Sequence, residues 1–376
     1  GMELYLHMPF CVRKCAYCDF LSFPSGAETQ RMYAKRLMKD IDVMGKRYGE
    51  IPVETIFIGG GTPSVPDSGL IVEIMEHVRH AFHVADGAEI SMEANPGTVT
   101  REKLTDYRKA GINRLSFGLQ SANDRELKLL GRIHTWAEFL ESFTLARECG
   151  FANLNIDLMS ALPGQTCESW KETLSRVTDL DPEHISAYSL IIEEGTPFGE
   201  RYGSEEGRKL LPDEDSEREM YHETKRFLKD CGYERYEISN YAKPGRECRH
   251  NIGYWTGVPY LGLGLGASSY LDGCRFTVNP DMKQYLEEKP GMFADIEKLT
   301  KKDMEEEFFY VGLRMTAGVS LSEFERRFGI SAKEVYPGLM ETFVKEKAAR
   351  FEGDRFVLTD YGLDVSNYIM AQFLQD

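Results

Sequence analysis

The chain has 376 residues, which is more than one ordinary domain needs and predicts two or three domains. Its 42% hydrophobic and 28% charged residues are typical of a soluble globular protein. The formal net charge of −16 disfavours nucleic acid and anionic membranes as partners, apart from peripheral contact through a local basic patch. We expect a cytoplasmic protein, since the sequence contains no signal peptide and no run of 18 apolar residues.

Short apolar segments alternate with helical segments over the first 190 residues. The predicted strands are residues 4–6, 54–58, 89–94, 114–118, 153–158 and 184–190, and the predicted helices are residues 29–48, 69–81, 100–110, 136–149 and 167–179. This alternation implies an α/β fold with a parallel sheet and right-handed crossovers. Six units are too few for a closed eight-stranded barrel. We therefore expect a partial (β/α)6 barrel over residues 1–200, with its function at the carboxyl ends of the strands.

Two further regions follow the predicted barrel. Residues 201–300 read as an accessory α+β region with a helix at 216–231, and residues 301–376 as a winged-helix-like module. The helices of this module are predicted at 302–315, 320–328 and 336–347, followed by a hairpin. The module holds 10 Lys and Arg against 14 Asp and Glu, whereas a groove-binding module should be locally basic. We therefore expect no nucleic-acid partner, and a role as a lid or a docking site.

Three cysteines lie within eight residues, directly after the first predicted strand. Cys11, Cys15 and Cys18 have the spacing C-x3-C-x2-C in the segment HMPFCVRKCAYCDF. Cysteine thiolates are the usual ligands of iron–sulfur clusters, and three ligands on a cubane leave one iron open to a chelating molecule. Two other interpretations remain at this point: reduced structural cysteines, or a zinc site whose fourth ligand lies elsewhere.

Polar residues follow the successive strands that come next. The segment GGGTP (residues 59–63) follows the second strand, and its glycines allow a ligand to approach the backbone closely. Glu93 ends the third strand, Gln120 follows the fourth, Arg132 lies in the next loop and Asp157 ends the fifth. A single residue of this kind is usually solvated or caps a helix. Four in succession at strand ends could together bond a ribose, a carboxylate and a purine edge.

The segment HNIGYW near the middle of the chain, in an expected polar loop, carries a second set of candidates. His250 is a potential haem ligand, and Tyr254 and Trp255 are aromatic residues that could flank a macrocycle. A histidine in such a loop is more often simply hydrogen-bonded. The segment therefore becomes informative only in combination with the other motifs.

The cysteine motif, with Tyr17 before its third cysteine, resembles the signature of the radical SAM superfamily. The resemblance implies a [4Fe–4S] cluster on the three cysteines, with S-adenosylmethionine chelating the open iron. It assigns the following residues to the S-adenosylmethionine pocket: Tyr5, Tyr17, Gly60, Gly61, Thr62, Glu93, Gln120, Arg132, Asp157 and Ile191.

Across nearly the whole chain, the order of the motifs resembles one branch of that superfamily. YLHMPFCVRKCAYCDF, GGGTPS, SFGLQS, DLMSALPGQT and HNIGYW occur as in the HemW haem chaperones and their relatives, the oxygen-independent coproporphyrinogen III oxidases. The oxidases extend the cysteine motif to C-x3-C-x2-C-x-C and carry an extension before the first strand. Here Phe20 stands at the fourth cysteine position, and the first strand begins near residue 3.

Both departures favour the chaperone branch. The resemblance then implies haem as cargo, bound near His250, Tyr254 and Trp255 and delivered to client haemoproteins. The alternative is the oxidase, an enzyme of porphyrin biosynthesis. We expect a monomer or a homodimer.

Overall fold

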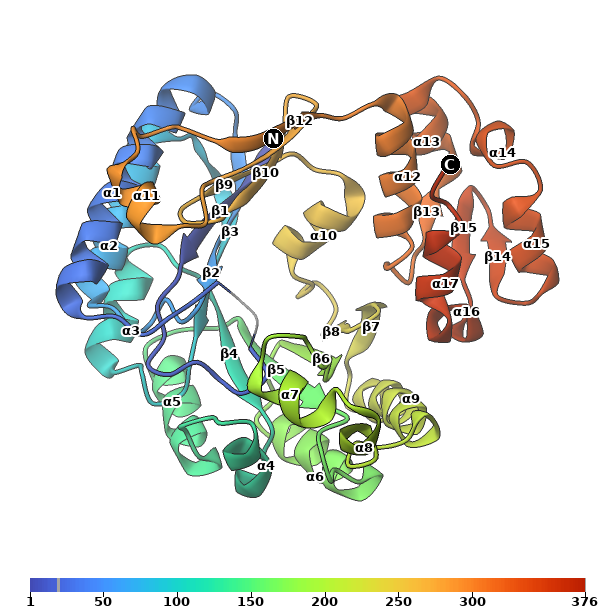
Figure 1. Ribbon diagram of the computed structural model, residues 1–376, viewed down its shortest axis with the longest axis horizontal. Helices are drawn as coiled ribbons and strands as arrows, with labels where there is room; N and C mark the ends of the chain where they lie inside the picture. Colours follow the sequence, from blue (N-terminus) through green and yellow to red (C-terminus); the bar gives the residue numbers. More distant parts are fainter. Residues whose placement is uncertain (19–20, 376) are drawn as a thin grey trace.

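Six parallel strands form the centre of one mixed sheet (Figure 1). The computed structural model describes residues 1–18 and 21–375. The central strands are β1 (Met2–Met8), β2 (Val53–Gly60), β3 (Val84–Ala94), β4 (Arg114–Gln120), β5 (Leu154–Ser160) and β6 (His184–Ser189). Leu4 and Leu6 pair with Ile56 and Ile58, and all four are buried. Such continuous apolar runs are typical of parallel strands covered on both faces.

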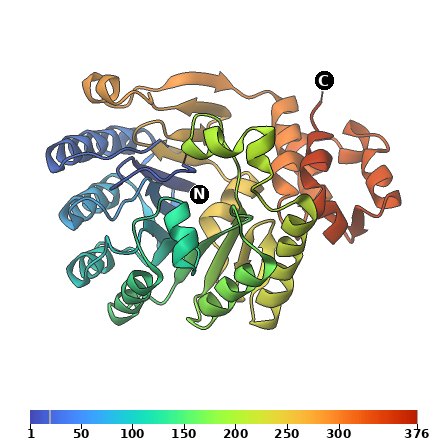
Figure 2. The same cartoon turned by 60° about the horizontal axis from the view of Figure 1, so that its bottom comes forward.

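Helices connect these strands and form an arc on the outside of the sheet (Figure 2). They are α1 (Ala27–Tyr48), α2 (Ser68–Ala81), α3 (Arg101–Lys109), α4 (Asp124–Leu129), α5 (Trp136–Glu148) and α6 (Cys167–Thr178). Their starts follow local signals, such as the capping box of Thr166 and Ser169 at the start of α6. The predicted partial (β/α)6 barrel is confirmed. Among the described helices that connect the six strands, the six-residue helix α4 was missing from the prediction.

Strands from residues 201–300 extend the same sheet at both edges. Next to β1 lie β9 (Tyr260–Leu263), β10 (Ser268–Leu271), β11 (Cys274–Thr277) and β12 (Ala294–Lys298); next to β6 lie β8 (Asn240–Ala242) and β7 (Glu234–Glu237). Strand β9 is parallel to β1, whereas β8 is antiparallel to β6. The accessory region therefore shares its sheet with the barrel, and the domain boundaries at residues 200 and 300 stay a prediction.

Within the described residues the accessory region has five helices, of which the sequence analysis predicted one, at residues 216–231. They are α7 (Pro197–Tyr202), α8 (Glu205–Arg208), α9 (Glu214–Asp230), α10 (Arg249–Thr256) and α11 (Met282–Glu287). Helices α7 and α8 lie around the predicted domain boundary at residue 200. The HNIGYW segment lies in α10, so the expectation of a polar loop there was wrong. The Glu89 carboxylate accepts hydrogen bonds from the backbone amides of Arg249 and His250, and so caps this helix from strand β3.

The C-terminal module has its own hydrophobic core, which includes Phe309, Phe324 and Phe373. Its helices are α12 (Lys301–Gly312), α13 (Leu321–Phe328), α14 (Ala332–Val335), α15 (Leu339–Lys345), α16 (Asp360–Asp364) and α17 (Ser366–Ala371). A small sheet joins β13 (Val319–Ser320), β15 (Arg355–Leu358) and β14 (Ala349–Glu352). The predicted helices and hairpin are present, with α14, α16 and α17 in addition.

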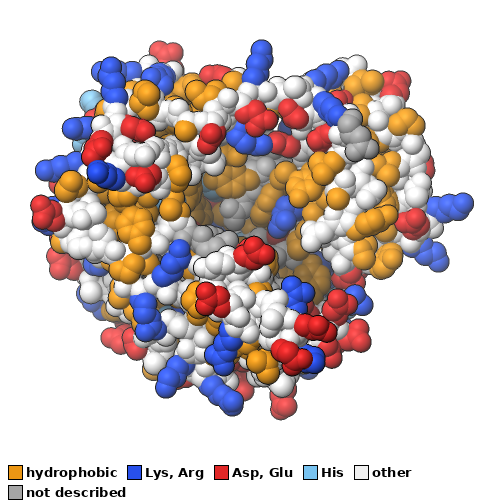
Figure 3. Space-filling view, viewed as in Figure 1, with side chains coloured by type: hydrophobic (Ala, Val, Ile, Leu, Met, Phe, Trp, Pro, Cys, Tyr) orange, Lys and Arg blue, Asp and Glu red, His pale blue; other side chains and the backbone are white. Residues whose placement is uncertain are grey.

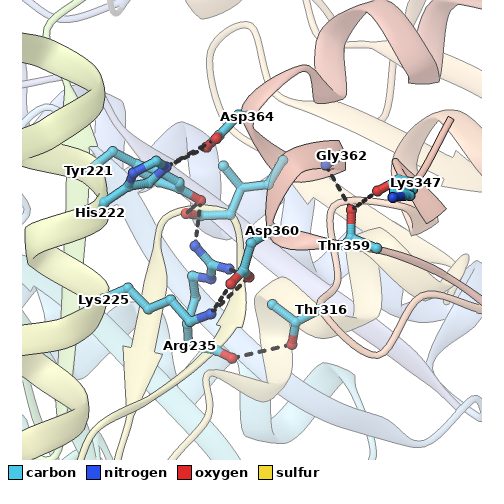
Figure 4. Close-up of polar contacts among 11 residues, drawn as sticks. Tyr221, His222, Lys225, Arg235, Thr316, Lys347, Thr359, Asp360, Gly362 and Asp364 are labelled. Atoms are coloured by element: carbon cyan, nitrogen blue, oxygen red, sulfur yellow. Dashed lines mark hydrogen bonds and ion pairs between the residues drawn. The ribbon is translucent and has the colours of Figure 1, made fainter. Parts of the chain in front are cut away.

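Polar contacts fasten this module to α9 and β7 (Figure 4). His222 Nε2 lies 3.0 Å from each carboxylate oxygen of Asp364. Lys225 and Arg235 donate to the carboxylate of Asp360 at 2.7 and 2.9 Å. Among the described residues, no helix is long and apolar enough to cross a membrane.

Candidate functional site

A cavity of about 450 Å³ opens at the carboxyl ends of the parallel strands. Parallel pairing brings these ends to the same edge of the sheet, so residues far apart in sequence gather there. Of the residues predicted for this site, those lining the cavity are Cys11, Cys15, Tyr17, Cys18, Gly60, Gly61, Thr62, Glu93, Gln120, Arg132, Asp157 and Ile191. The structure therefore brings together the cysteine loop and the polar strand ends.

The three cysteines lie on one wall of this cavity, in a loop without helix or strand. The backbone amide of Cys18 donates to the carbonyl of Cys15 at 3.1 Å, which closes a tight turn between them. Burial raises the pKa of the Cys11 thiol, and the neighbouring Cys18 and Cys15 raise it further. Within the described residues, no three His, Cys, Asp or Glu side chains converge closely enough to hold a metal ion. The three thiols therefore line the same cavity but do not converge on one point.

The glycines after β2 allow the cysteine loop to pass close to the strand end. Gly60 has φ of +120°, and a Cβ atom there would lie 2.8 Å from the His7 ring. A Cβ on Gly61 would lie 2.4 Å from the carbonyl oxygen of Phe10, immediately before Cys11. Since real Cβ contacts do not reach such distances, both positions need glycine.

Arg132 connects the polar residues to the cysteine loop. Its guanidinium donates to Asn95 Oδ1 at 3.0 Å and to the carbonyl of Gly118, and lies 3.6 Å from Cys15 Sγ. Asn95 in turn donates to the hydroxyl of Thr62 at 2.7 Å. The network fixes the guanidinium beside the sulfur of Cys15.

Two carboxyl groups, Glu93 and Asp157, face the same cavity from β3 and β5. Burial raises the pKa of Glu93 to about 8, and the nearby Asp157 adds to this shift. Burial also raises the pKa of Asp157, although a hydrogen bond from Asn155 opposes the change. Because burial opposes the charged form of both carboxyl groups, the site favours a ligand whose amino or hydroxyl groups can donate to them.

The cavity has further lining residues that the sequence analysis missed. They include Arg13, Lys14, Asn95, Ser116 and Tyr188. Asn95 directly follows β3 within the motif MEANP, so its place at a strand end was a usable signal. Tyr5 is the exception among the predicted residues. It lines an adjoining cavity of about 220 Å³ inside the barrel, which shares Glu93 and Asp157 with the first. The Tyr5 hydroxyl lies 2.9 Å from His7 Nδ1.

The predicted haem residues lie on α10, and two of them, His250 and Tyr254, line the adjoining cavity together with Tyr5. His250 is buried, with a side-chain exposure of 1%. Its Nδ1 lies 2.7 Å from the Thr55 hydroxyl, and its Nε2 lies 2.6 Å from the Tyr254 hydroxyl. Burial lowers the pKa of His250 to about 3, so the ring is neutral. Binding iron would require one of these two hydrogen bonds to break.

Glu3 and Gly253 complete the surroundings of His250. The Thr55 hydroxyl lies 3.0 Å from Glu3 Oε2 as well as 2.7 Å from His250 Nδ1. With Tyr254 at Nε2, both ring nitrogens of His250 are therefore engaged in hydrogen bonds. A Cβ on Gly253 would lie 2.2 Å from Glu3 Oε2. Three residues of the HNIGYW segment, His250, Gly253 and Tyr254, are thus explained by packing on β1 and β2.

Comparison with known proteins agrees with this geometry. The Radical SAM superfamily matches residues 5–177, and the HemN C-terminal domain matches residues 299–365. The solved structure of coproporphyrinogen III oxidase (HemN) from Escherichia coli superposes with a TM-score of 0.86 at 24% identity, covering 99% of this chain and 90% of that one. A barrel with three cysteines after its first strand, followed by this C-terminal domain, defines a radical SAM protein with the HemN fold.

Individual relatives of known name place the chain in a narrower family within this class. Heme chaperone HemW from Bacillus subtilis (strain 168) is 35% identical over 374 residues, which cover 98% of both chains. Heme chaperone HemW from Escherichia coli (strain K12) is 35% identical over 382 residues, covering 100% of this chain and 98% of the relative. The chain belongs to the HemW family.

Proposed function

We propose that this protein is a cytoplasmic haem chaperone that binds a [4Fe–4S] cluster and S-adenosylmethionine, carries haem and delivers it to client haemoproteins. The observation that carries the first part is the single cavity shared by Cys11, Cys15 and Cys18 with the polar strand ends. The names of the relatives support the second part. Reduced thiols of this kind persist in the cytoplasm, which supports that location.

In this proposal, the chain's own residues hold and orient the two cofactors. Cys11, Cys15 and Cys18 would bind three irons, and the bound cluster would supply one-electron chemistry. Glu93 and Asp157 would accept hydrogen bonds from the amino group and the ribose of S-adenosylmethionine. A bound cation would return both carboxyl groups to the charged form that burial now opposes.

The glycine segment and the loop after β6 would enclose the ligand. Gly60 and Gly61 line the cavity, where a ligand amino group could hydrogen-bond to main-chain carbonyls. Ile191 is 68% exposed at the mouth of the cavity, where it could cover an adenine face. Tyr17 lines the same cavity as the thiols, where it would limit the access of water to a bound cluster.

The alternative function is oxygen-independent coproporphyrinogen III oxidation. The likeness to HemN supports it only at the level of the fold, given 24% identity. Phe20 replaces the extra cysteine of the oxidases in sequence, although this position lies outside the described residues. We therefore favour the chaperone.

The deciding experiment uses anaerobically reconstituted protein. With haem loaded, mixing with an apo-haemoprotein should transfer haem, because a client that binds haem more tightly than its carrier takes it up. With S-adenosylmethionine and coproporphyrinogen, no protoporphyrinogen should form. Decarboxylation without haem transfer would establish the oxidase instead.

A further inference from the structure

A second cavity, of about 930 Å³, lies between the barrel and the C-terminal module. Figure 3 shows a hollow between these two parts, with hydrophobic side chains on its walls. One wall consists of Tyr254 and Trp255 of α10 with the tyrosines of β9 and β10. The other wall consists of residues of α12 and the segment that follows it. The volume falls within the range of about 300–1,000 Å³ that is typical of small-molecule sites.

The surfaces of this cavity suit a flat apolar ring. On the side of the C-terminal module they are Met304, Phe308, Val311, Met315 and Phe328. Phe308 packs edge-on against Phe328, with ring centroids 6.1 Å apart. On the opposite side, Trp255 of α10 is among the aromatic lining residues and has the largest ring system of them. Aromatic and thioether walls that face each other across a gap are favourable for a π-system between them.

The charge of the lining differs from that of the chain. Among the described residues, the cavity is lined by six cations and two carboxylates; the cations are Arg275, Lys301, Arg314, Arg326, Arg327 and Arg355. The whole chain, by contrast, has a net charge of −16. Arg326 and Arg327 share one carboxylate, that of Glu323, which leaves positive charge in excess at this point. An apolar slot with a cationic rim fits a planar molecule that carries more than one carboxylate.

His250 supports this cavity without reaching it. Both of its ring nitrogens are hydrogen-bonded, and within the described part of the chain no histidine lines the cavity. The bond from Tyr254 to His250 instead holds in place the helix that presents Trp255. The Thr256 carbonyl at the end of this helix accepts from Arg327 of α13 at 2.9 Å, which joins the two walls.

We propose that this cavity is the seat of the haem macrocycle, with Trp255 as an aromatic anchor, Lys301 and Arg326 as partners of the propionates, and His250 as a positioning residue. The inference rests on the proposed function, because that function supplies haem as the ligand. It makes the C-terminal module one half of the cargo site. Release then requires only that the two walls separate.

The first test measures binding of haem and of iron-free protoporphyrin by absorbance and by quenching of tryptophan fluorescence. Trp255→Ala should weaken the binding of haem and of protoporphyrin about 30-fold, as expected for a central aromatic anchor. Trp255→Phe should retain most of the affinity, which separates loss of the ring from loss of the fold. Unchanged affinity in Trp255→Ala, with wild-type protein binding haem, would place the macrocycle elsewhere.

The second test addresses the carboxylates. The dimethyl ester of the porphyrin should bind wild-type protein roughly 2- to 30-fold more weakly than the free acid, the range expected for two exposed ion pairs. In Lys301→Gln/Arg326→Gln this difference should vanish, because the partners of the carboxylates are gone. The matched control, Lys46→Gln/Arg101→Gln, removes the same charge from α1 and α3 and should keep the difference. Equal behaviour of the two double variants would overturn the assignment.

The third test separates a positioning role of His250 from iron ligation. At saturating haem, His250→Gln should show the same Soret maximum as wild-type protein, although its affinity is lower. A shifted maximum at saturation would mean that His250 binds the iron and would refute this part of the inference. Absence of haem binding by wild-type protein is a different outcome, because it would reject the proposed function itself.

Discussion

The two cavities of this protein are built in different ways. The first lies at one edge of a parallel sheet, and short segments that directly follow successive strands supply most of its lining. The second lies between two hydrophobic cores and is lined by α10, β9 to β11 and the C-terminal module. The topology of the barrel fixes the first cavity, whereas docking of two bodies fixes the second. A change at one site should therefore leave the other nearly intact, which the following experiments examine.

The largest effect is expected from the cysteines. In the variant Cys11→Ala/Cys15→Ala/Cys18→Ala, anaerobic reconstitution should give no cluster, whereas wild-type protein should give about four irons and four sulfides per chain. Haem binding should persist in the variant, because its cavity shares no lining residue with that of the cysteines. Iron and sulfide analysis with a parallel haem titration measures both. A full cluster in the variant would refute the assignment of the ligands.

A smaller effect is expected from the carboxyl groups of the first cavity. Glu93→Ala and Asp157→Ala should each weaken S-adenosylmethionine binding roughly 5- to 150-fold, which corresponds to a loss of about 1–3 kcal/mol for a buried polar partner. The cluster spectrum should stay unchanged. Equilibrium dialysis with the reconstituted protein measures the affinity, and Glu148→Ala on the outer helix α5 is the control. Wild-type affinity in both variants would mean that the pocket is misplaced.

The sequence predicted the first cavity well because its determinants are local. The cysteine spacing, the glycines and the polar residues after each strand are visible as short motifs, and the parallel fold brings such positions together. Tyr5 does not line the cavity, since it lies within β1 and its side chain faces the interior of the barrel. Gln120 could be placed at a strand end, but its φ of +74° could not be foreseen. That conformation depends on the surrounding structure, because non-glycine residues rarely adopt it.

The second cavity could not be predicted in the same way. Trp255, Arg275 and Met304 lie in three elements whose proximity depends on how the C-terminal module docks. The local pattern of HNIGYW did not reveal α10 either, since its N-terminal amides are capped by Glu89 from a distant strand. The sequence pointed to His250 as a haem ligand. Its contacts with Thr55 and Tyr254 arise from tertiary packing and give it a different environment.

The pH dependence of the free energy of unfolding should reveal the ionisation of Glu3, which packs beside His250 beneath the second cavity. Burial raises the pKa of Glu3 to about 8, and Thr55, His250, Glu89 and Arg249 surround this carboxyl group. A carboxyl group whose pKa is raised on folding makes a contribution to stability that is fully present below the pKa of that group in the unfolded chain. That contribution is lost as the pH rises through the folded pKa. Wild-type protein should therefore lose stability relative to Glu3→Gln between about pH 4.5 and about pH 8.

Urea unfolding of both proteins across this range measures the difference, which should reach the order of a few kcal/mol and level off above about pH 8. His250 is unaltered in both proteins, so its lowered pKa affects them alike and cancels in the comparison. A constant difference between the two proteins at every pH would show that Glu3 titrates normally in the fold.

The smallest effect is expected where the C-terminal module meets α9. Asp360→Asn removes the ion pairs with Lys225 and Arg235, but the Asp360 side chain is 70% exposed, so water and salt already screen them. We expect the free energy that holds the module in its docked position to fall by about 0.2–1 kcal/mol. This loss should appear as faster amide hydrogen exchange in α16 and α13, and the effect of the substitution should be smaller at high salt. Because the second cavity needs the docked module, haem should dissociate slightly faster from the variant, while S-adenosylmethionine binding stays unchanged. Equal changes at both cavities would show that they are coupled through the fold, and the contrast between them would then fail.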